Sequence, residues 1–202
     1  MPAFAQRCAP LIKLLGAILA GGASRRFGSD KAAALLDGLP LIEHVRAALV
    51  PQVDALILCG RDWPGMMPVA DLPERDLGPL GGLCAALAYA RDNGFAEVLT
   101  VGCDVLPVPA DLAERLRPAP AVADGQPLFG RWPAALADRL LQHLLRDHSR
   151  SVRAWVEAAG ARRVPLDVML HNFNRAEDLA TYAEARKVTK VPVKRGTTRD
   201  LR

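Results

Sequence analysis

One loop of the chain combines closely spaced glycines with fixed positive charge. Residues 19–31 read LAGGASRRFGSDK and follow a short apolar run. Glycines let a backbone approach a ligand closely and expose successive amide donors, and Arg25, Arg26 and Lys31 add cations that suit a polyphosphate. The spacing matches neither GxGxxG nor GxxxxGK[ST]. We therefore predict phosphate binding from the strand context and the cations; the alternative is an ordinary glycine-rich turn with solvated basic residues.

A carboxylate follows a second apolar run. Residues 102–107 read GCDVLP, and Asp104 stands where a predicted strand ends. Proteins commonly hold Mg²⁺ with one or two carboxylates together with phosphate oxygens of the substrate. Beside a phosphate-binding loop, Asp104 is predicted to bind Mg²⁺; the alternative is an aspartate that caps a turn. Cys103 is interpreted as a small packing residue.

Two further stretches carry polar groups next to helix starts. Asp71 precedes the sequence GPLGG at residues 78–82, where a proline suits the first turn of a helix with free amides. Residues 171–179 read HNFNRAEDL, and Asn172 and Asn174 occupy alternate positions, so both can face one side of an extended segment. Asparagine also favours helix caps, so capping is the alternative.

The elements that must position these residues alternate between strands and helices. Short apolar runs predict strands at residues 14–20, 53–59, 67–70, 97–102, 119–123 and 162–167, with extended segments at 32–36 and 127–131. Helical patterns occupy residues 40–49, 79–92, 111–117, 133–146, 151–159 and 177–187. This alternation predicts an α/β fold, a single three-layer domain with a mostly parallel central sheet and helices on both faces. Ligands of such sheets bind beyond the carboxyl ends of the strands.

The composition agrees with one folded domain. The chain has 202 residues, of which 50% are hydrophobic and 24% charged, and this excludes a disordered chain. Four scattered cysteines without a CxxC pair argue against structural zinc and fit a reducing cytoplasm. The apolar run at residues 11–22 is interrupted by Lys13 and is too short to span a membrane, so no membrane association is expected.

The positive charge is concentrated at one end. The formal net charge is +4, yet residues 186–202 carry seven basic side chains against one acid, so the remaining body is slightly acidic. The body has no basic stripe interleaved with aromatic residues, so no nucleic-acid partner is expected. We expect a leader of little structure at residues 1–12, a domain at 13–187 and a flexible basic tail at 188–202.

The four stretches together resemble the molybdenum cofactor guanylyltransferases, and more broadly the nucleotidyltransferases of the sugar-nucleotide pyrophosphorylase fold. The family's opening LAGGxSxRxGxDK matches residues 19–31, with Arg26 and Lys31 on its arginine and lysine. Its D…GPLxG falls on Asp71 and residues 78–82, its CDxP on Asp104, and its NxNTPEDL on residues 172–179. The resemblance implies a Rossmann-like domain of the nucleotide-diphospho-sugar transferase type.

The resemblance also implies an activity and a role for each matched residue. The reaction would be a Mg²⁺-dependent transfer of GMP from GTP to the terminal phosphate of molybdenum-bound molybdopterin, with release of pyrophosphate. Arg26, Lys31 and Asp104 would be catalytic, and Asp104 would be the metal ligand. The nucleotide would contact Leu19, Ala20, Gly21, Gly22, Lys31, Asp71, Gly78 and Asp104. Gly82, Asn172 and Asn174 would face the second substrate, and a molybdoenzyme or another cofactor-maturation protein would be a further partner.

Two departures from the family pattern leave alternatives open. Leu106 replaces the proline of CDxP, with Pro107 one place later, and Arg175-Ala176 replaces the Thr-Pro of NxNTPEDL. The alternatives are a cytidylyltransferase or a sugar-phosphate nucleotidyltransferase of the same fold, or a non-catalytic carrier of nucleotide or molybdopterin. The residues by themselves do not distinguish GTP from CTP.

Overall fold

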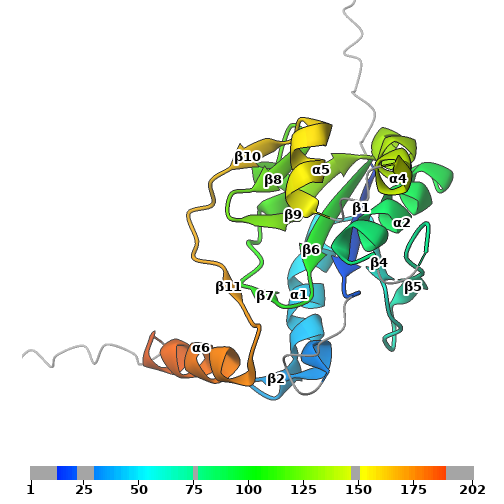
Figure 1. Ribbon diagram of the computed structural model, residues 1–202. Coiled ribbons are helices and arrows are strands. Elements are labelled where there is room, and N and C mark those ends of the chain that lie inside the picture. Colours follow the sequence, from blue (N-terminus) through cyan, green and yellow to red (C-terminus); the bar gives the residue numbers. More distant parts are fainter. Residues whose placement is uncertain (1–12, 22–29, 75–76, 147–150, 190–202) are drawn as a thin grey trace, which may run out of the picture.

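The computed structural model describes residues 13–21, 30–74, 77–146 and 151–189. A seven-stranded sheet runs through its centre in the order β10-β8-β9-β6-β1-β4-β5 (Figure 1). Its strands are β1 (Leu14–Leu19), β4 (Ala55–Cys59), β5 (Met67–Val69), β6 (Glu97–Gly102), β8 (Ala121–Ala123), β9 (Gln126–Pro133) and β10 (Arg162–Val164). The mostly parallel sheet is confirmed, except that β9 runs antiparallel to both β6 and β8.

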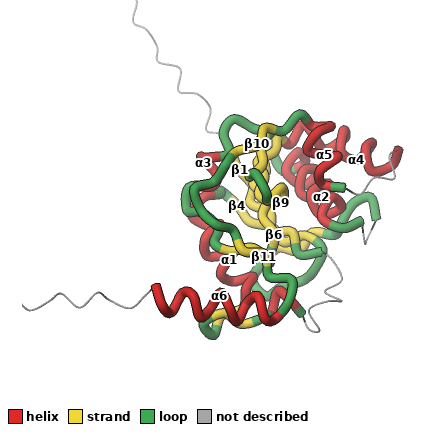
Figure 2. The backbone as a smooth tube through the Cα atoms, turned by 60° about the vertical axis from the view of Figure 1, so that its left-hand side comes forward, coloured by secondary structure: helices red, strands yellow, loops and turns green. Residues whose placement is uncertain are grey.

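Helices cover both faces of this sheet (Figures 1 and 2). They are α1 (Leu41–Leu49), α2 (Pro79–Asp92), α3 (Leu112–Arg115), α4 (Ala137–Arg146) and α5 (Val152–Ala159), while α6 (Ala176–Thr189) lies to one side of the sheet. A hydrophobic core lies on each side of the sheet. The side chains of β1 enter the two cores in turn, because successive side chains of a strand point to opposite faces. Leu14 and Ile18 pack with α1 and α3, whereas Leu15 and Ala17 pack with α2, α4 and α5. The predicted three-layer α/β domain is therefore confirmed.

Two short strand pairs lie outside the main sheet. β2 (Leu35–Leu36) and β3 (Leu39–Pro40) form a hairpin whose turn residues Asp37 and Gly38 have φ values of 52° and 81°. Two positive φ angles are typical of the tight turns that favour Asp-Gly. β7 (Val105–Leu106) pairs antiparallel with β11 (His171–Asn172), a contact between segments far apart in the chain.

The ends of several elements differ from their predicted positions. α2 and β6 span the predicted residues, while β4 begins two residues later than expected, at Ala55. Helix α6 continues to Thr189, two residues past the predicted end of the domain. The predicted leader and residues 190–202 of the predicted tail lie outside the described residues.

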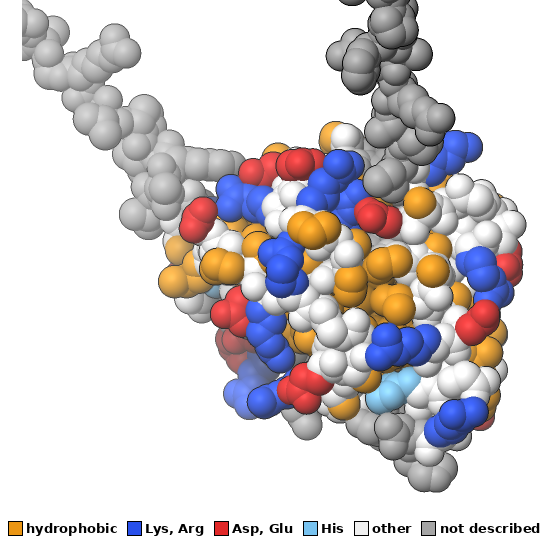
Figure 3. All heavy atoms as spheres, turned by 90° about the horizontal axis from the view of Figure 1, so that it is seen from above, with side chains coloured by type: hydrophobic (Ala, Val, Ile, Leu, Met, Phe, Trp, Pro, Cys, Tyr) orange, Lys and Arg blue, Asp and Glu red, His pale blue; other side chains and the backbone are white. Residues whose placement is uncertain are grey.

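The described surface mixes charges of both signs with apolar side chains. On the face seen in Figure 3, basic and acidic side chains are interspersed around apolar patches and form no stripe of one sign. Among the described residues, no helix has both the length and the apolar character needed to cross a membrane.

Candidate functional site

The carboxyl ends of the central strands meet at one edge of the sheet. Leu19, at the end of β1, pairs with Cys59 at the end of β4 and with Gly102 at the end of β6. Hydrogen bonds continue beyond the strands, from the Ala20 N–H to the Cys59 carbonyl over 3.0 Å and from the Cys103 N–H to the Leu19 carbonyl over 3.2 Å. The loops that leave these strands therefore start side by side, where an α/β sheet binds its ligands.

A lysine ammonium joins two of the predicted functional stretches at this edge. Lys31 Nζ lies 2.6 Å from Asp104 Oδ2 and donates to Asn174 Oδ1 over 3.1 Å. The side chains of Lys31 and Asp104 are 16% and 21% exposed, so the ion pair is shielded yet open to a ligand. The structure thus brings together three residues that lie up to 143 positions apart.

The β7–β11 pairing carries Asn174 to this place. Asp104 directly precedes β7, and the N–H of Phe173 donates to the Asp104 carbonyl over 3.0 Å. Phe173 is fully buried and anchors the segment. Asp178, in the first turn of α6, accepts from the N–H groups of Asn174 and Arg175. The side-chain oxygen of Asn174 instead accepts from Lys31.

Asp71 lies among glycines that permit a close approach of three loops. A Cβ built on Gly21 would stand 3.1 Å from Asp71 Oδ2, and one built on Gly60 would stand 2.5 Å from the Gly21 Cα. Gly60 also has a φ of 87°, a conformation that glycine adopts without strain. Gly82 is buried in α2 beneath Asp71, where a Cβ would lie 3.5 Å from Asp71 Oδ1.

The first residue of α2 is flanked by open space. Gly78 is the N-cap of α2, with φ 68°, and a Cβ built on it would meet no atom of the described residues within 4 Å. Pro79, the first residue of α2, has no N–H, and the N–H of Gly81 donates to the Gly78 carbonyl over 3.1 Å, so this helix start offers room beside Gly78 rather than a row of free amides.

A cavity of about 190 Å³ lies at this junction. The residues that line it are Leu19, Ala20, Gly21, Lys31, Ala32, Arg61, Pro79, Cys103, Asp104 and Leu128. Leu19, Ala20, Gly21, Lys31 and Asp104 are among the predicted site residues. Gly22 and Arg26 lie outside the described residues.

Arg61 is a cavity residue that the sequence analysis missed. It follows Gly60 directly after β4, and its guanidinium forms a two-pronged ion pair with Asp30, with Nη1 2.6 Å from Oδ1. The rule that ligands bind at strand ends was applied to the first and fourth predicted strands; applied to the second, it would have found Arg61.

The pKa shifts at the site keep the Asp30–Arg61 pair charged and the Cys103 thiol neutral. The hydrogen bond from Arg61 holds the pKa of the Asp30 carboxyl below its usual range, so this pair stays ionised. Burial raises the pKa of Cys103 to about 12, with a further contribution from Asp104. Cys103 is therefore a neutral thiol at physiological pH, in agreement with the packing role expected for it.

The donor set suits a hard cation that brings most of its own ligands. The described residues contain no cluster of three or more histidine, cysteine or acidic side chains placed to hold a metal. One carboxylate, Asp104, and one amide oxygen, Asn174, meet around the Lys31 ammonium. Mg²⁺ is commonly bound by such a small oxygen set, completed by phosphate and water, so the residues fit this ion.

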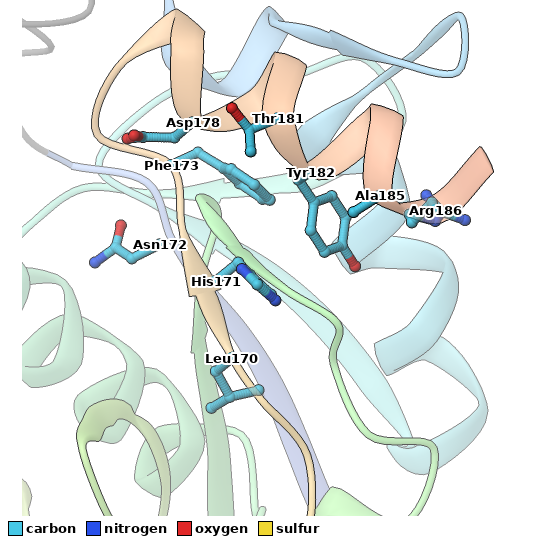
Figure 4. A pocket seen from close by; sticks show the side chains of 9 residues that line it. All are labelled: Leu170, His171, Asn172, Phe173, Asp178, Thr181, Tyr182, Ala185 and Arg186. Carbon is cyan, nitrogen blue, oxygen red and sulfur yellow. The ribbon is translucent and has the colours of Figure 1, made fainter. Parts of the chain in front are cut away.

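A second, larger cavity of about 760 Å³ lies between the β11 segment and α6 (Figure 4). His171 and Tyr182 face it, with ring centres 4.8 Å apart, whereas the Asn172 side chain points the other way. Arg186 lies over the Tyr182 ring and pairs with Asp37 of the β2–β3 turn over 3.2 Å. This contact ties α6 to the hairpin that follows Lys31.

Comparison with known proteins identifies the class. Residues 16–166 match the model of the MobA-like NTP transferase domain, and the chain belongs to this family of nucleotidyltransferases. Two relatives named molybdenum cofactor guanylyltransferase, from Cereibacter sphaeroides and Rhodobacter capsulatus, are each 37% identical. Both alignments cover 84% of this chain, and they cover 95% and 94% of the relatives.

A solved structure supports the fold. The molybdopterin-guanine dinucleotide biosynthesis protein A of Archaeoglobus fulgidus aligns with a TM-score of 0.69 at 22% identity. The alignment covers 86% of this chain and 99% of that one. The family expected from the sequence motifs is confirmed.

Proposed function

We propose that this protein transfers GMP from GTP to the terminal phosphate of molybdenum-bound molybdopterin and releases pyrophosphate. The observation that carries the proposal is the Lys31 ammonium, 2.6 Å from Asp104 and 3.1 Å from Asn174, at the strand ends of a MobA-like NTP transferase domain. The names of the 37%-identical relatives support guanine as the base and molybdenum cofactor as the acceptor.

The chemistry joins two anions, so positioning and charge neutralisation carry it. An oxygen of the acceptor phosphate attacks the α-phosphorus of GTP, a new P–O bond forms, and the bond to the β-phosphate breaks with its electron pair leaving on pyrophosphate. The attacking oxygen is already ionised near neutral pH, so no general base is required. Lys31 stabilises the charge that grows on the leaving pyrophosphate, and Arg26 is proposed to share this role.

Asp104 is the residue that would hold Mg²⁺. The ion, when bound, would supply positive charge to the phosphate oxygens of the two substrates. When phosphate oxygens enter the cavity, the Lys31 ammonium can exchange part of its contact with Asp104 for contact with them, because a flexible four-carbon stem carries it. Asp104, through the metal ion, and Lys31, directly, would thus both neutralise the charge of the triphosphate.

The remaining residues orient the substrates. Gly21 and the neighbouring Leu19 and Ala20 let the nucleotide lie against the backbone, and Gly22 is proposed to extend this surface. Asp71 is proposed to contact the nucleoside, with Gly78 leaving room at the start of α2. Asn172 and Asn174 are assigned to the second-substrate side, and Gly82, buried beneath Asp71, is proposed to act there by letting α2 pack closely on β1 and β4 rather than by direct contact. We also propose a cytoplasmic location, which the free thiols of Cys59, Cys84 and Cys103 support.

The test is pyrophosphate release with Mg²⁺, each nucleoside triphosphate in turn, and molybdenum-loaded molybdopterin as acceptor. We expect release with GTP alone, loss of release in EDTA and recovery with added Mg²⁺. Asp104→Asn removes the charge without changing side-chain size and is expected to abolish release, while the exposed Asp111→Asn serves as the matched control. Release with CTP alone would move the protein to the cytidylyl branch. Binding of GTP without any release would replace the proposal with a carrier.

A further inference from the structure

The ion pair between Arg61 and Asp30 connects the end of β4 to the residue before Lys31. Both terminal nitrogens of the guanidinium donate to Asp30, Nη1 to Oδ1 over 2.6 Å and Nη2 to Oδ2. The Arg61 and Asp30 side chains are 26% and 43% exposed. A two-pronged arginine–carboxylate contact fixes orientation as well as distance.

Asp30 also organises the turn that carries Lys31. Lys31–Ala33 forms a single 3₁₀ turn, and the Asp30 side chain caps it by accepting from the Ala32 N–H over 3.1 Å. The Asp30 carbonyl accepts from the Ala33 N–H, also over 3.1 Å. A three-residue 3₁₀ turn has few hydrogen bonds of its own, so its direction depends on the cap. The carboxylate that caps the turn is the one that Arg61 holds.

The Lys31 side chain reaches its partners reliably only if its backbone is also held in place. Its tip meets Asp104, which follows β6, and Asn174, which follows β11. Those contacts define where the ammonium must be, while the flexible stem leaves the backbone end free to move. The Arg61–Asp30 pair supplies the missing restraint from a third element, β4.

The terminal N–H groups of the Arg61 guanidinium are used in the contact with Asp30. Both Nη atoms face Asp30, and the buried Nε has no hydrogen-bond partner among the described residues. The guanidinium also lies over the Trp63 ring, 5.5 Å from its centre, and Trp63 is held by a 2.7 Å hydrogen bond to Glu43. The cation is thus packed from one side and paired on the other.

We propose that Arg61 is a positioning residue for GMP transfer, which acts through Asp30 to place the Lys31 ammonium beside Asp104. The inference rests on the proposed function, since it assigns Arg61 a part in that reaction. It predicts that Arg61 affects turnover through Lys31 rather than through affinity for GTP.

The test compares Arg61→Gln and Asp30→Asn with wild-type protein in GMP transfer, together with GTP binding by calorimetry. We expect kcat to fall about 10- to 100-fold in each variant, since small misplacements of a catalytic group have effects of this order. The Kd for GTP should change less than about threefold, and Arg61→Lys, which keeps the charge and loses one prong, should be intermediate. Arg115→Gln is the matched control, because it removes an exposed arginine from its ion pair with Asp111.

A second comparison asks whether Arg61 acts through Lys31. Arg61→Gln added to Lys31→Ala should slow turnover less than about twofold further, because residues that act as a unit are not additive. Multiplicative effects, or a wild-type kcat in Arg61→Gln, would overturn the inference. So would a tenfold rise in the Kd for GTP with kcat intact, which would make Arg61 a nucleotide contact.

The two proposals fail in different ways. If wild-type protein transfers no GMP, the proposed function is wrong and this inference falls with it. If wild-type protein transfers GMP and both Arg61→Gln and Asp30→Asn equal it, the inference alone is wrong. Should Arg61→Gln not fold, Asp30→Asn carries the same test, because it breaks the same pair from the exposed side.

Discussion

The backbone N–H of Phe173 donates to the carbonyl oxygen of Asp104 over 3.0 Å. This hydrogen bond extends the β7–β11 pair and brings a segment near the end of the chain onto the residue that would hold Mg²⁺. Because Phe173 is fully buried, the two asparagines on either side of it are held in place by the core. Backbone hydrogen bonds therefore join the segment proposed to meet the second substrate to the residue proposed to hold the metal.

Lys31→Ala should remove most of the activity without unfolding the protein. Lys31 is the described cation closest to Asp104, and removing one preorganised electrostatic contact typically costs about 3 kcal/mol in the transition state, or a factor of about 100. The measurement is kcat for pyrophosphate release alongside thermal unfolding. Lys13→Ala, at the opposite end of β1, should keep wild-type turnover. Turnover near wild type in Lys31→Ala would refute its role.

Asn174→Ala should weaken use of the acceptor while leaving GTP binding intact. The variant removes one hydrogen bond to Lys31 and the amide that faces the proposed second substrate, with a cost of about 1–2 kcal/mol. Steady-state kinetics with varied molybdenum-loaded molybdopterin should show kcat/KM about tenfold lower. Asn93→Ala, which alters an exposed contact at the end of α2, is the control. A rise in the Kd for GTP with normal use of the acceptor would place Asn174 on the nucleotide side instead.

Gly60→Ala should destabilise the protein far more than Gly125→Ala. Both glycines have positive φ, 87° and 74°, so each alanine bears a conformational cost of about 1–2 kcal/mol. Only Gly60 is also crowded, with a built Cβ 2.5 Å from the Gly21 Cα, and such overpacking adds about 1–3 kcal/mol. Urea denaturation of the two variants gives the comparison. Equal losses of stability would show that the two loops can separate without cost.

The buried thiols should be inert at neutral pH and weaken the fold at high pH. Burial raises the pKa of Cys59 and of Cys103 to about 12 in each case, compared with 9.0 for an exposed thiol. The unfolded chain therefore releases these protons first, and the free energy of unfolding should fall as pH rises above about 9. Iodoacetamide at pH 8 should label Cys59 and Cys103 only after denaturation, as mass spectrometry would show. Rapid labelling of Cys103 in the native protein would contradict its buried, neutral state.

The helices and strands predicted best are those whose ends are marked by residues within the element itself. α2 and β6 begin and end as expected, because a proline and an alanine-rich run define the helix and a mostly apolar run that ends at Gly102 defines the strand. Gly21 and Asp104 could be predicted for the same reason, since each lies just past a strand whose end is marked in the local sequence, and Lys31 could be predicted from the glycine-rich loop that it closes.

The pairings between distant segments were not predictable in this way. β7 and β11 are two residues long, too short for any periodic pattern, and they exist because they hydrogen-bond to each other. The antiparallel direction of β9 likewise depends on its partners β6 and β8.

Local sequence thus determined the strand-and-helix order, the family and most of the residues that would meet phosphate, since these follow from patterns of a few neighbouring side chains. Tertiary structure decided that Asn174 reaches Lys31 and that Arg61 holds Asp30, contacts that join residues 143 and 31 positions apart. Such contacts depend on loop closure and on the register of a shared sheet, and these are properties of the whole folded chain.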